Sequence, residues 1–199
     1  MVVMSGDDFA PTQCKYKTKG IITMMTDLRK RKPVLWMTVT AMLTAANIVL
    51  SMSIFSIPVP GGHFYLNDVI IDTAALLLDP LAAFIVGGVG AFLGDAIFYP
   101  APMFVSLVTH GLQAIIVSLC AHKLTKFKPV LAAAIGVTIG ALIMVLGYTI
   151  GRAYIYSTPE YAIIKLPFEF LQAGVGAVGS MILVFVARLD KAYERIILK

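Results

Sequence analysis

Residues 66–99 read LNDVIIDTAALLLDPLAAFIVGGVGAFLGDAIFY, an apolar stretch that contains four aspartates and no lysine or arginine. Pro80 lies near its middle, and a proline ends or kinks a helix at the residue before it. The stretch is therefore predicted to form a hairpin of two membrane helices, 66–78 and 81–99. The carboxylate of Asp95 then lies inside the second helix with no cation near it in the sequence, which raises the question of its role.

The composition of the whole chain is typical of a membrane protein. Of its 199 residues, 59% are hydrophobic and 14% are charged, and the mean hydropathy is +0.87. Soluble domains have about 45–50% apolar and about 25% charged residues. Cys14 and Cys120 lie far apart and do not indicate a disulfide framework. The bilayer is therefore the predicted solvent of this chain.

Four further apolar runs reach the roughly 20 residues that a helix needs to cross about 30 Å of hydrocarbon. They cover residues 34–56, 103–122, 129–151 and 162–187. The predicted fold class is all-α, an integral membrane protein with six transmembrane helices and both termini in the cytoplasm. Its predicted parts are a flexible N-terminal segment (1–32), a six-helix membrane domain (33–188) and a cytoplasmic tail (189–199).

The positions of the basic residues predict the orientation, since cytoplasmic loops carry an excess of Lys and Arg. With both termini inside, 14 of the 16 Lys and Arg residues fall on the cytoplasmic side. Arg152 and Lys165 are the two that remain on the outer side. We therefore predict a multi-pass protein of the bacterial plasma membrane.

In this orientation, polar side chains gather in the outer halves of the spans. They share helix faces, and they are Asp68 with Asp72, then Asp95, then Ser106 with His110 and Gln113, then Tyr148 with Arg152, then Lys165 with Glu169 and Gln172. An ionisable group in a membrane helix costs about 2.5–3.5 kcal/mol and usually faces a cavity or a partner. The set therefore predicts a polar cup that opens to the outside.

Some members of this set have simpler explanations. Asp68 near a helix start could complement the helix dipole and face water. Arg152 and Lys165 could be ordinary interfacial residues. Asp95 is expected on the wall of the cup, where it either contacts a solute or holds a neighbour such as His110 or Arg152 in place.

Four stretches of the chain carry a resemblance to a known family, in the right order. They are YLNDVIIDTAALLLDPLAAFIVGGVGAFLGD (65–95), APMFVSLVTHGLQAIIVSL (101–119), GYTIGRAYIY (147–156) and LPFEFLQAGVGAVGS (166–180). Together they resemble the substrate-binding S components of energy-coupling-factor (ECF) vitamin transporters, in particular the branch related to the riboflavin S component. The resemblance implies a membrane protein that captures a vitamin from outside and delivers it with a transmembrane coupling subunit and two cytoplasmic ATPases. It also implies that Ala41 and Ala45, which match the family's Ala-x-x-x-Ala, dock on the coupling subunit.

The resemblance leaves the solute open. Family members often carry Asn at the position of Glu169, so this chain departs from the riboflavin pattern. Glu169, Asp95 and His110 together favour a small basic heteroaromatic, either pyridoxine-type vitamin B6 or the hydroxymethylpyrimidine precursor of thiamine, with riboflavin as the alternative. Residues expected to bind it, including aromatic stacking walls, are His63, Tyr65, Asp68, Asp95, Phe104, His110, Gln113, Tyr148, Arg152, Phe168, Glu169 and Gln172.

The sequence contains no Walker loop, dinucleotide fingerprint, HExxH zinc pattern or GxSxG elbow. We therefore expect no catalytic residue, no metal, no cofactor and no nucleic-acid partner. Two other interpretations stay open. One is a carrier that works alone on an ion gradient. The other is a small membrane enzyme that holds a metal with Asp68, Asp72 and Asp95.

Overall fold

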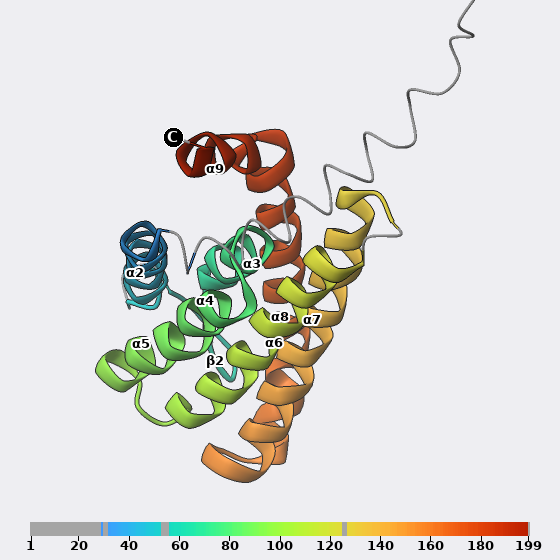
Figure 1. Ribbon diagram of the computed structural model, residues 1–199. Helices are drawn as coiled ribbons and strands as arrows, with labels where there is room; N and C mark the ends of the chain where they lie inside the picture. The colour runs from blue at the N-terminus through green and yellow to red at the C-terminus, as the bar shows by residue number, and fades with distance from the viewer. Residues whose placement is uncertain (1–28, 30–31, 53–55, 125–126, 199) are drawn as a thin grey trace, which may run out of the picture.

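The structure is a computed structural model that describes residues 29, 32–52, 56–124 and 127–198 (Figure 1). The predicted flexible segment 1–32 therefore lies, apart from Arg29 and Lys32, outside the described residues. The described chain is mostly helical, as predicted. Its elements in order are α2 (Pro33–Leu50), β1 (Ile57–Val59), β2 (Gly62–Phe64), α3 (Asn67–Leu77), α4 (Pro80–Phe84), η2 (Ile85–Val89), α5 (Gly90–Phe98), α6 (Met103–Lys123), α7 (Pro129–Gly151), η3 (Arg152–Tyr156), α8 (Pro159–Met181), η4 (Ile182–Val186) and α9 (Leu189–Leu198).

Five helical segments of the described chain are long and apolar enough to cross a membrane. They are Pro33–Leu50, Pro80–Phe98, Met103–Lys123, Pro129–Tyr156 and Pro159–Val186, three of which contain a π-helical turn, labelled η. Five of the six predicted spans thus have helices of suitable length and composition. A π-turn adds one residue to a helix without ending it, so α4, η2 and α5 form one continuous helix.

The helix predicted over 66–78 differs from the other five. As α3 it has 11 residues, which at 1.5 Å each give about 16 Å, half the thickness of the hydrocarbon layer. Nine of these residues are buried, and Figure 1 shows α3 surrounded by other helices. This apolar run therefore fills the centre of the bundle. Its hydrophobicity reflects burial among helices, which a count of apolar residues does not distinguish from contact with lipid.

The helix break predicted at Pro80 is present. α3 ends at Leu77, and the Asp79 carboxylate caps α4 by accepting the backbone N–H of Leu81 at 3.3 Å. The Trp36 indole of α2 donates to the same carboxylate at 2.5 Å. Asp79 and Ser118 are both buried at this end of the bundle, away from the side chains predicted to form the cup.

The connection after α2 contains a short antiparallel β-hairpin. Val59 pairs with Gly62 across the turn, and Ile57 pairs with Phe64 at the open end. Gly61 has a φ of +81°, a conformation that glycine adopts without a steric penalty. The hairpin is the only sheet among the described residues, and its turn packs against the first half of α8, where a Cβ on Gly61 would lie 3.0 Å from the Cβ of Lys165.

Helix α2 lies at the edge of the bundle, and most of its surface is exposed (Figure 1). Its buried Asn47 donates to the carbonyl of Val86 at 2.6 Å, inside the π-turn η2. Gly90 lets α2 approach closely, because a Cβ there would lie 2.7 Å from the Asn47 amide nitrogen. Ala41 and Ala45 both remain exposed on the free surface of α2.

Of the tail predicted over 189–199, residues Leu189–Leu198 form the helix α9, and residue 199 lies outside the described residues. It begins after Arg188, whose φ is +58°, and lies across the end of the bundle where the last span finishes (Figure 1). Tyr193 is buried and belongs to the main hydrophobic core. The tail is therefore packed on the bundle, at the end opposite the β-hairpin.

Candidate functional site

A cavity lies beneath the β-hairpin, where α3, α6 and α8 begin and where α5 and α7 end. About 510 Å³ of atom-free space, part of it open to solvent, lies between the lining residues. Its lining is mostly polar and aromatic, and consists of Ser51, Gly62, His63, Tyr65, Asn67, Ala91, Asp95, Tyr99, Pro102, His110, Tyr148, Arg152, Tyr156, Lys165, Glu169 and Gln172.

Most of the side chains that the sequence analysis assigned to the cup meet at this cavity. Those in the wall are His63, Tyr65, Asp95, His110, Tyr148, Arg152, Glu169 and Gln172. Asp68 and Gln113 are fully buried just behind the wall and are bonded to its residues. The polar helix faces predicted from the sequence therefore converge at one end of the bundle.

Phe104 and Phe168 were wrongly placed in the cup. Phe104 is 63% exposed and its ring packs against Phe92, with centroids 5.7 Å apart on the outside of the bundle. It lies two residues before Ser106, which puts it about 200° around the helix from the polar stripe. Phe168 is half-buried and lies outside the lining, one residue and thus about 100° from Glu169.

Two buried cations hold the β-hairpin over the cavity. Arg152 of η3 donates to the Gly61 carbonyl at 2.6 Å, and the Lys165 ammonium of α8 donates to the His63 carbonyl. Arg152 also donates to Glu169 at 2.9 Å. Arg152 and Lys165 are only 8% and 1% exposed as whole residues, so the alternative that they are ordinary interfacial residues is wrong.

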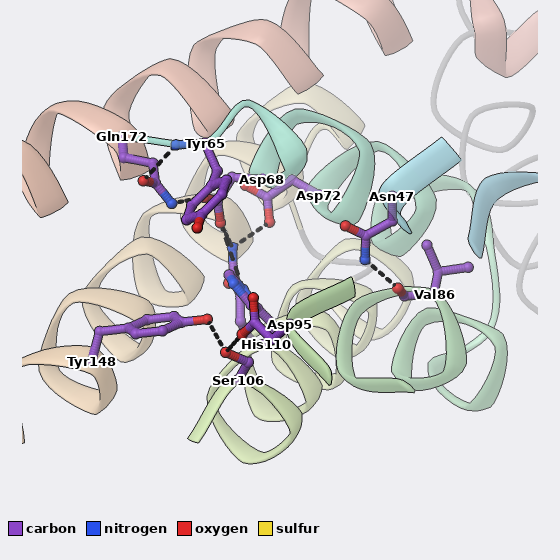
Figure 2. Close-up of polar contacts among 11 residues, drawn as sticks. Asn47, Tyr65, Asp68, Asp72, Val86, Asp95, Ser106, His110, Tyr148 and Gln172 are labelled. Carbon is purple, nitrogen blue, oxygen red and sulfur yellow. Dashed lines mark hydrogen bonds and ion pairs between the residues drawn. The ribbon is translucent and has the colours of Figure 1, made fainter. Parts of the chain in front are cut away.

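The structure answers the question raised by Asp95. Its carboxylate lines the cavity and accepts a hydrogen bond from the Ser106 hydroxyl of the next helix. Ser106 lies 2.6 Å from the Tyr148 hydroxyl, so three helices are joined at this point (Figure 2). The sequence analysis named His110 or Arg152 as the neighbour that Asp95 could hold in place. In the structure its hydrogen-bond partner is Ser106. Within the described chain, no cation lies within ion-pair distance of Asp95.

A buried network behind the cavity wall links α3, α6 and α8 (Figure 2). The Gln113 amide donates to Asp72 at 3.0 Å and to Asp68 at 3.3 Å, while its oxygen lies 2.8 Å from the Nδ1 of His110. Gln172 donates to Asp68 at 2.7 Å. Asp68 is therefore buried and bonded, which excludes the alternative that it faces water.

Tyr65 connects the β-hairpin to the helices. Its backbone N–H donates to the side-chain oxygen of Gln172 at 3.0 Å. Burial, and secondarily the nearby Asp95 carboxylate, raises the pKa of the Tyr65 hydroxyl to about 12. The hydroxyl therefore stays protonated at neutral pH and can donate a hydrogen bond into the cavity.

Four polar wall residues were not predicted as members of the site. Ser51, Asn67, Tyr99 and Tyr156 all lie at helix ends, where helical periodicity gives no prediction. Lys165 was predicted to share a face of its helix with Glu169 and Gln172, but it was left out of the residues expected to bind the solute.

The three aspartates that could have formed a metal site do not meet. Asp68 and Asp72 are bridged by Gln113, while Asp95 is bonded to Ser106. Within the ranges that the structure describes, no group of three or more His, Cys, Asp or Glu side chains has a metal-binding arrangement.

Comparison with known proteins identifies the family. The family model described as "ECF-type riboflavin transporter, S component" matches residues 33–191. The thiamine precursor transporter HmpT of Lactococcus lactis is 32% identical over 160 residues, which are 78% of this chain and 89% of HmpT. An uncharacterized protein of Pyrococcus woesei is also 32% identical, over 133 residues, which are 66% of this chain and 87% of that protein. The chain therefore belongs to the S-component family of ECF-type transporters, and it is a multi-pass membrane protein that binds the solute for a vitamin or vitamin-precursor transporter, not an enzyme.

Proposed function

We propose that this S component captures the hydroxymethylpyrimidine precursor of thiamine in the cavity beneath the β-hairpin. The observation that carries the proposal is the Asp95 carboxylate, which lines the cavity with a hydroxyl as its partner. A carboxylate forms strong, charge-assisted hydrogen bonds with an amino group or a protonated ring nitrogen. An aminopyrimidine offers both, and the similarity to a thiamine precursor transporter supports this choice over pyridoxine.

Three wall residues carry buried polar atoms that lack a protein partner. They are the amide oxygen of Asn67, the Nε of Arg152 and the hydroxyl of Tyr156, each without a hydrogen bond from the described residues. Buried polar groups in folded proteins almost always have partners. A hydroxymethyl group and ring nitrogens of the solute are suited to these positions, and the surrounding tyrosine rings offer aromatic faces for a flat heterocycle.

We infer a different role for the carboxylate of Glu169 from the solute contact expected from the sequence. Its bond to Arg152 neutralises it, and Arg152 in turn holds Gly61 of the hairpin. The β-hairpin thus acts as a lid over the cavity. We infer that Glu169 and Arg152 keep this lid closed, while Asp95 makes the main charged contact with the solute.

We further propose that α2 docks on a transmembrane coupling subunit, which works with two cytoplasmic ATPases. Its exposed face contains a shallow groove lined by Trp36, Met37, Thr40, Ala41, Thr44, Ala45, Ile48 and Ile85. Small residues let membrane helices approach closely where lipid offers no hydrophobic driving force. The two alanines thus provide a smooth surface for a partner helix.

Equilibrium binding to the purified, detergent-solubilised protein tests the solute. We expect isothermal titration calorimetry to give tight binding of hydroxymethylpyrimidine and weaker binding of pyridoxine and riboflavin. Tight binding of riboflavin, with no binding of the pyrimidine or pyridoxine, would overturn the proposal.

Reconstitution tests the mode of transport. We expect proteoliposomes that contain this chain alone to show no concentrative uptake in a sodium or proton gradient. Uptake should appear when the coupling subunit, both ATPases and ATP are added. Gradient-driven accumulation by the chain alone would instead identify a carrier that works by itself.

Replacing Asp95 by asparagine should weaken hydroxymethylpyrimidine binding by about 1.5–3 kcal/mol, the range for a hydrogen bond to a charged group. The substitution keeps the shape and the bond from Ser106 but removes the negative charge. Calorimetry measures the change in Kd. Asp190→Asn on α9, far from the cavity, serves as the control, and an unchanged Kd for Asp95→Asn would remove Asp95 from the site.

Replacing Lys165 by methionine should speed solute release by about tenfold, because the hairpin loses a charged hydrogen bond at His63. Stopped-flow dissociation of bound solute measures this rate. Lys123→Met, at the exposed end of α6 away from the cavity, is the matched control. A release rate equal to that of the wild type would show that Lys165 does not hold the lid.

A further inference from the structure

The orientation of the Gln113 amide is fixed by two carboxylates. Its nitrogen lies 3.0 Å from an Asp72 oxygen and 3.3 Å from an Asp68 oxygen, and all three side chains are almost fully buried. The NH₂ group of an amide has two hydrogens, so it can donate one to each carboxylate, and the carboxylates accept them. The amide oxygen must then point the other way, toward His110.

This orientation decides which nitrogen of His110 carries the proton. The Gln113 oxygen lies 2.8 Å from Nδ1 of the ring, and a carbonyl oxygen can only accept, so Nδ1 must donate. A carboxylate oxygen of Asp68 lies 3.7 Å from the same Nδ1 and favours a proton there as well. Gln172, itself held by the backbone of Tyr65, fixes Asp68 from its other side.

With the proton on Nδ1, the neutral ring presents Nε2 as a hydrogen-bond acceptor. His110 is part of the cavity wall and lies edge-on to Tyr148, with ring centroids 5.2 Å apart. Across the described ranges, no protein atom forms a hydrogen bond with Nε2, and His110 lies one helical turn after Ser106, the residue that donates to Asp95. The wall therefore offers two acceptors, the Asp95 carboxylate and the His110 Nε2.

We propose that Asp68 and Asp72 are positioning residues that act through Gln113 to hold His110 in its Nδ1-protonated form, so that the cavity selects a solute with a primary amino group at this point. An amino group has two hydrogens and can donate to Asp95 and His110 together. A carbonyl group in its place would set an oxygen against two acceptors, and sites with unpaired buried polar groups reject such analogues strongly. The proposal rests on the proposed function, since it takes the cavity to be the solute site.

The tautomer of His110 can be measured in the unmodified protein. The chain has three histidines, so nuclear magnetic resonance of protein labelled with ¹⁵N-histidine gives few signals. The signals that disappear in His110→Asn are those of His110. We expect the Nδ1 of His110 to be protonated and its Nε2 unprotonated at neutral pH. A proton on Nε2 instead of Nδ1 overturns the proposal, whether or not any solute binds.

A double variant, Asp68→Asn with Asp72→Asn, tests the positioning role. Both new amides can donate as well as accept, so the orientation of Gln113 is no longer fixed and His110 can take the other tautomer. Hydroxymethylpyrimidine and its analogue with a carbonyl in place of the amino group are compared by calorimetry. We expect the preference for the amino compound to fall by about tenfold, together with a shift of the His110 signal toward Nε2 protonation.

Asp79→Asn makes the same chemical change at a helix cap far from the cavity, and should alter neither the preference nor the signal. An unchanged preference in a folded double variant whose tautomer has shifted overturns the selection of an amino group. The wild-type spectrum needs no variant, so the proposal can be tested even if the double variant does not fold. A wild-type Nδ1 proton without binding of either pyrimidine supports the positioning role and contradicts the proposed solute.

Discussion

Replacing Ala41 and Ala45 together by tryptophan should abolish solute uptake by the assembled transporter while the solute affinity of the isolated S component stays unchanged. Both alanines lie on the exposed face of α2, in a groove away from the cavity. Two indole rings there would prevent the close approach that a small-residue helix face allows. Uptake of radiolabelled solute into proteoliposomes with the complete module measures the first effect, and calorimetry of the isolated subunit measures the second.

The matched control is Val108→Trp with Leu112→Trp. These residues have the same spacing as the two alanines and lie exposed on the surface of α6. Two added indoles at this site should reduce uptake little, which separates a docking effect from a general effect of bulky residues in the membrane. Normal uptake by the Ala41→Trp, Ala45→Trp variant would remove α2 from the interface with the coupling subunit.

Replacing Glu169 by leucine should have the largest effect on the site itself. The Glu169 carboxylate lies 2.9 Å from Arg152, and both side chains are buried. Removing one partner of a buried ion pair leaves an uncompensated charge, at a cost of about 3–5 kcal/mol. We expect a lower melting temperature of the apo protein and weaker solute binding, because Arg152 also holds the Gly61 carbonyl of the lid.

The double variant Arg152→Met with Glu169→Leu distinguishes this account from a direct solute contact of Glu169. Since no charge is left unpaired, it should recover much of the melting temperature lost in Glu169→Leu, while solute release stays fast. Glu160→Leu, exposed in the first turn of α8, is the control. An unchanged melting temperature in Glu169→Leu would show that the ion pair does not stabilise the lid.

The parts of the fold that depend on local sequence were predicted well. The break at Pro80 follows from proline geometry, and five long apolar runs became helices that can span a membrane. The stripe of Ser106, His110 and Gln113 was predicted because residues spaced by one helical turn share a face, and all three are buried. Periodicity, however, cannot separate a helix buried in protein from one that faces lipid, so the burial of α3 at the centre of the bundle was not predicted.

The details of the site depend on contacts between distant segments. Lys165 and Arg152 are buried because they reach backbone carbonyls of the β-hairpin, 102 and 91 residues away in the sequence. Asp95 accepts a hydrogen bond from Ser106 on the next helix, and the sequence alone does not identify this partner. Phe104 and Phe168 were chosen as aromatic residues near polar ones, although their positions around the helices place them outside the cavity wall.

Native mass spectrometry after competition tests the central claim most directly, that the cavity beneath the β-hairpin is a site for an aminopyrimidine. The purified protein is incubated with equal concentrations of hydroxymethylpyrimidine, pyridoxine and riboflavin, and the mass of the retained compound is read from the intact complex. We predict a single adduct with the mass of hydroxymethylpyrimidine, which is lost in Asp95→Asn. Retention of riboflavin, or of the pyrimidine with equal occupancy in Asp95→Asn, would contradict the account.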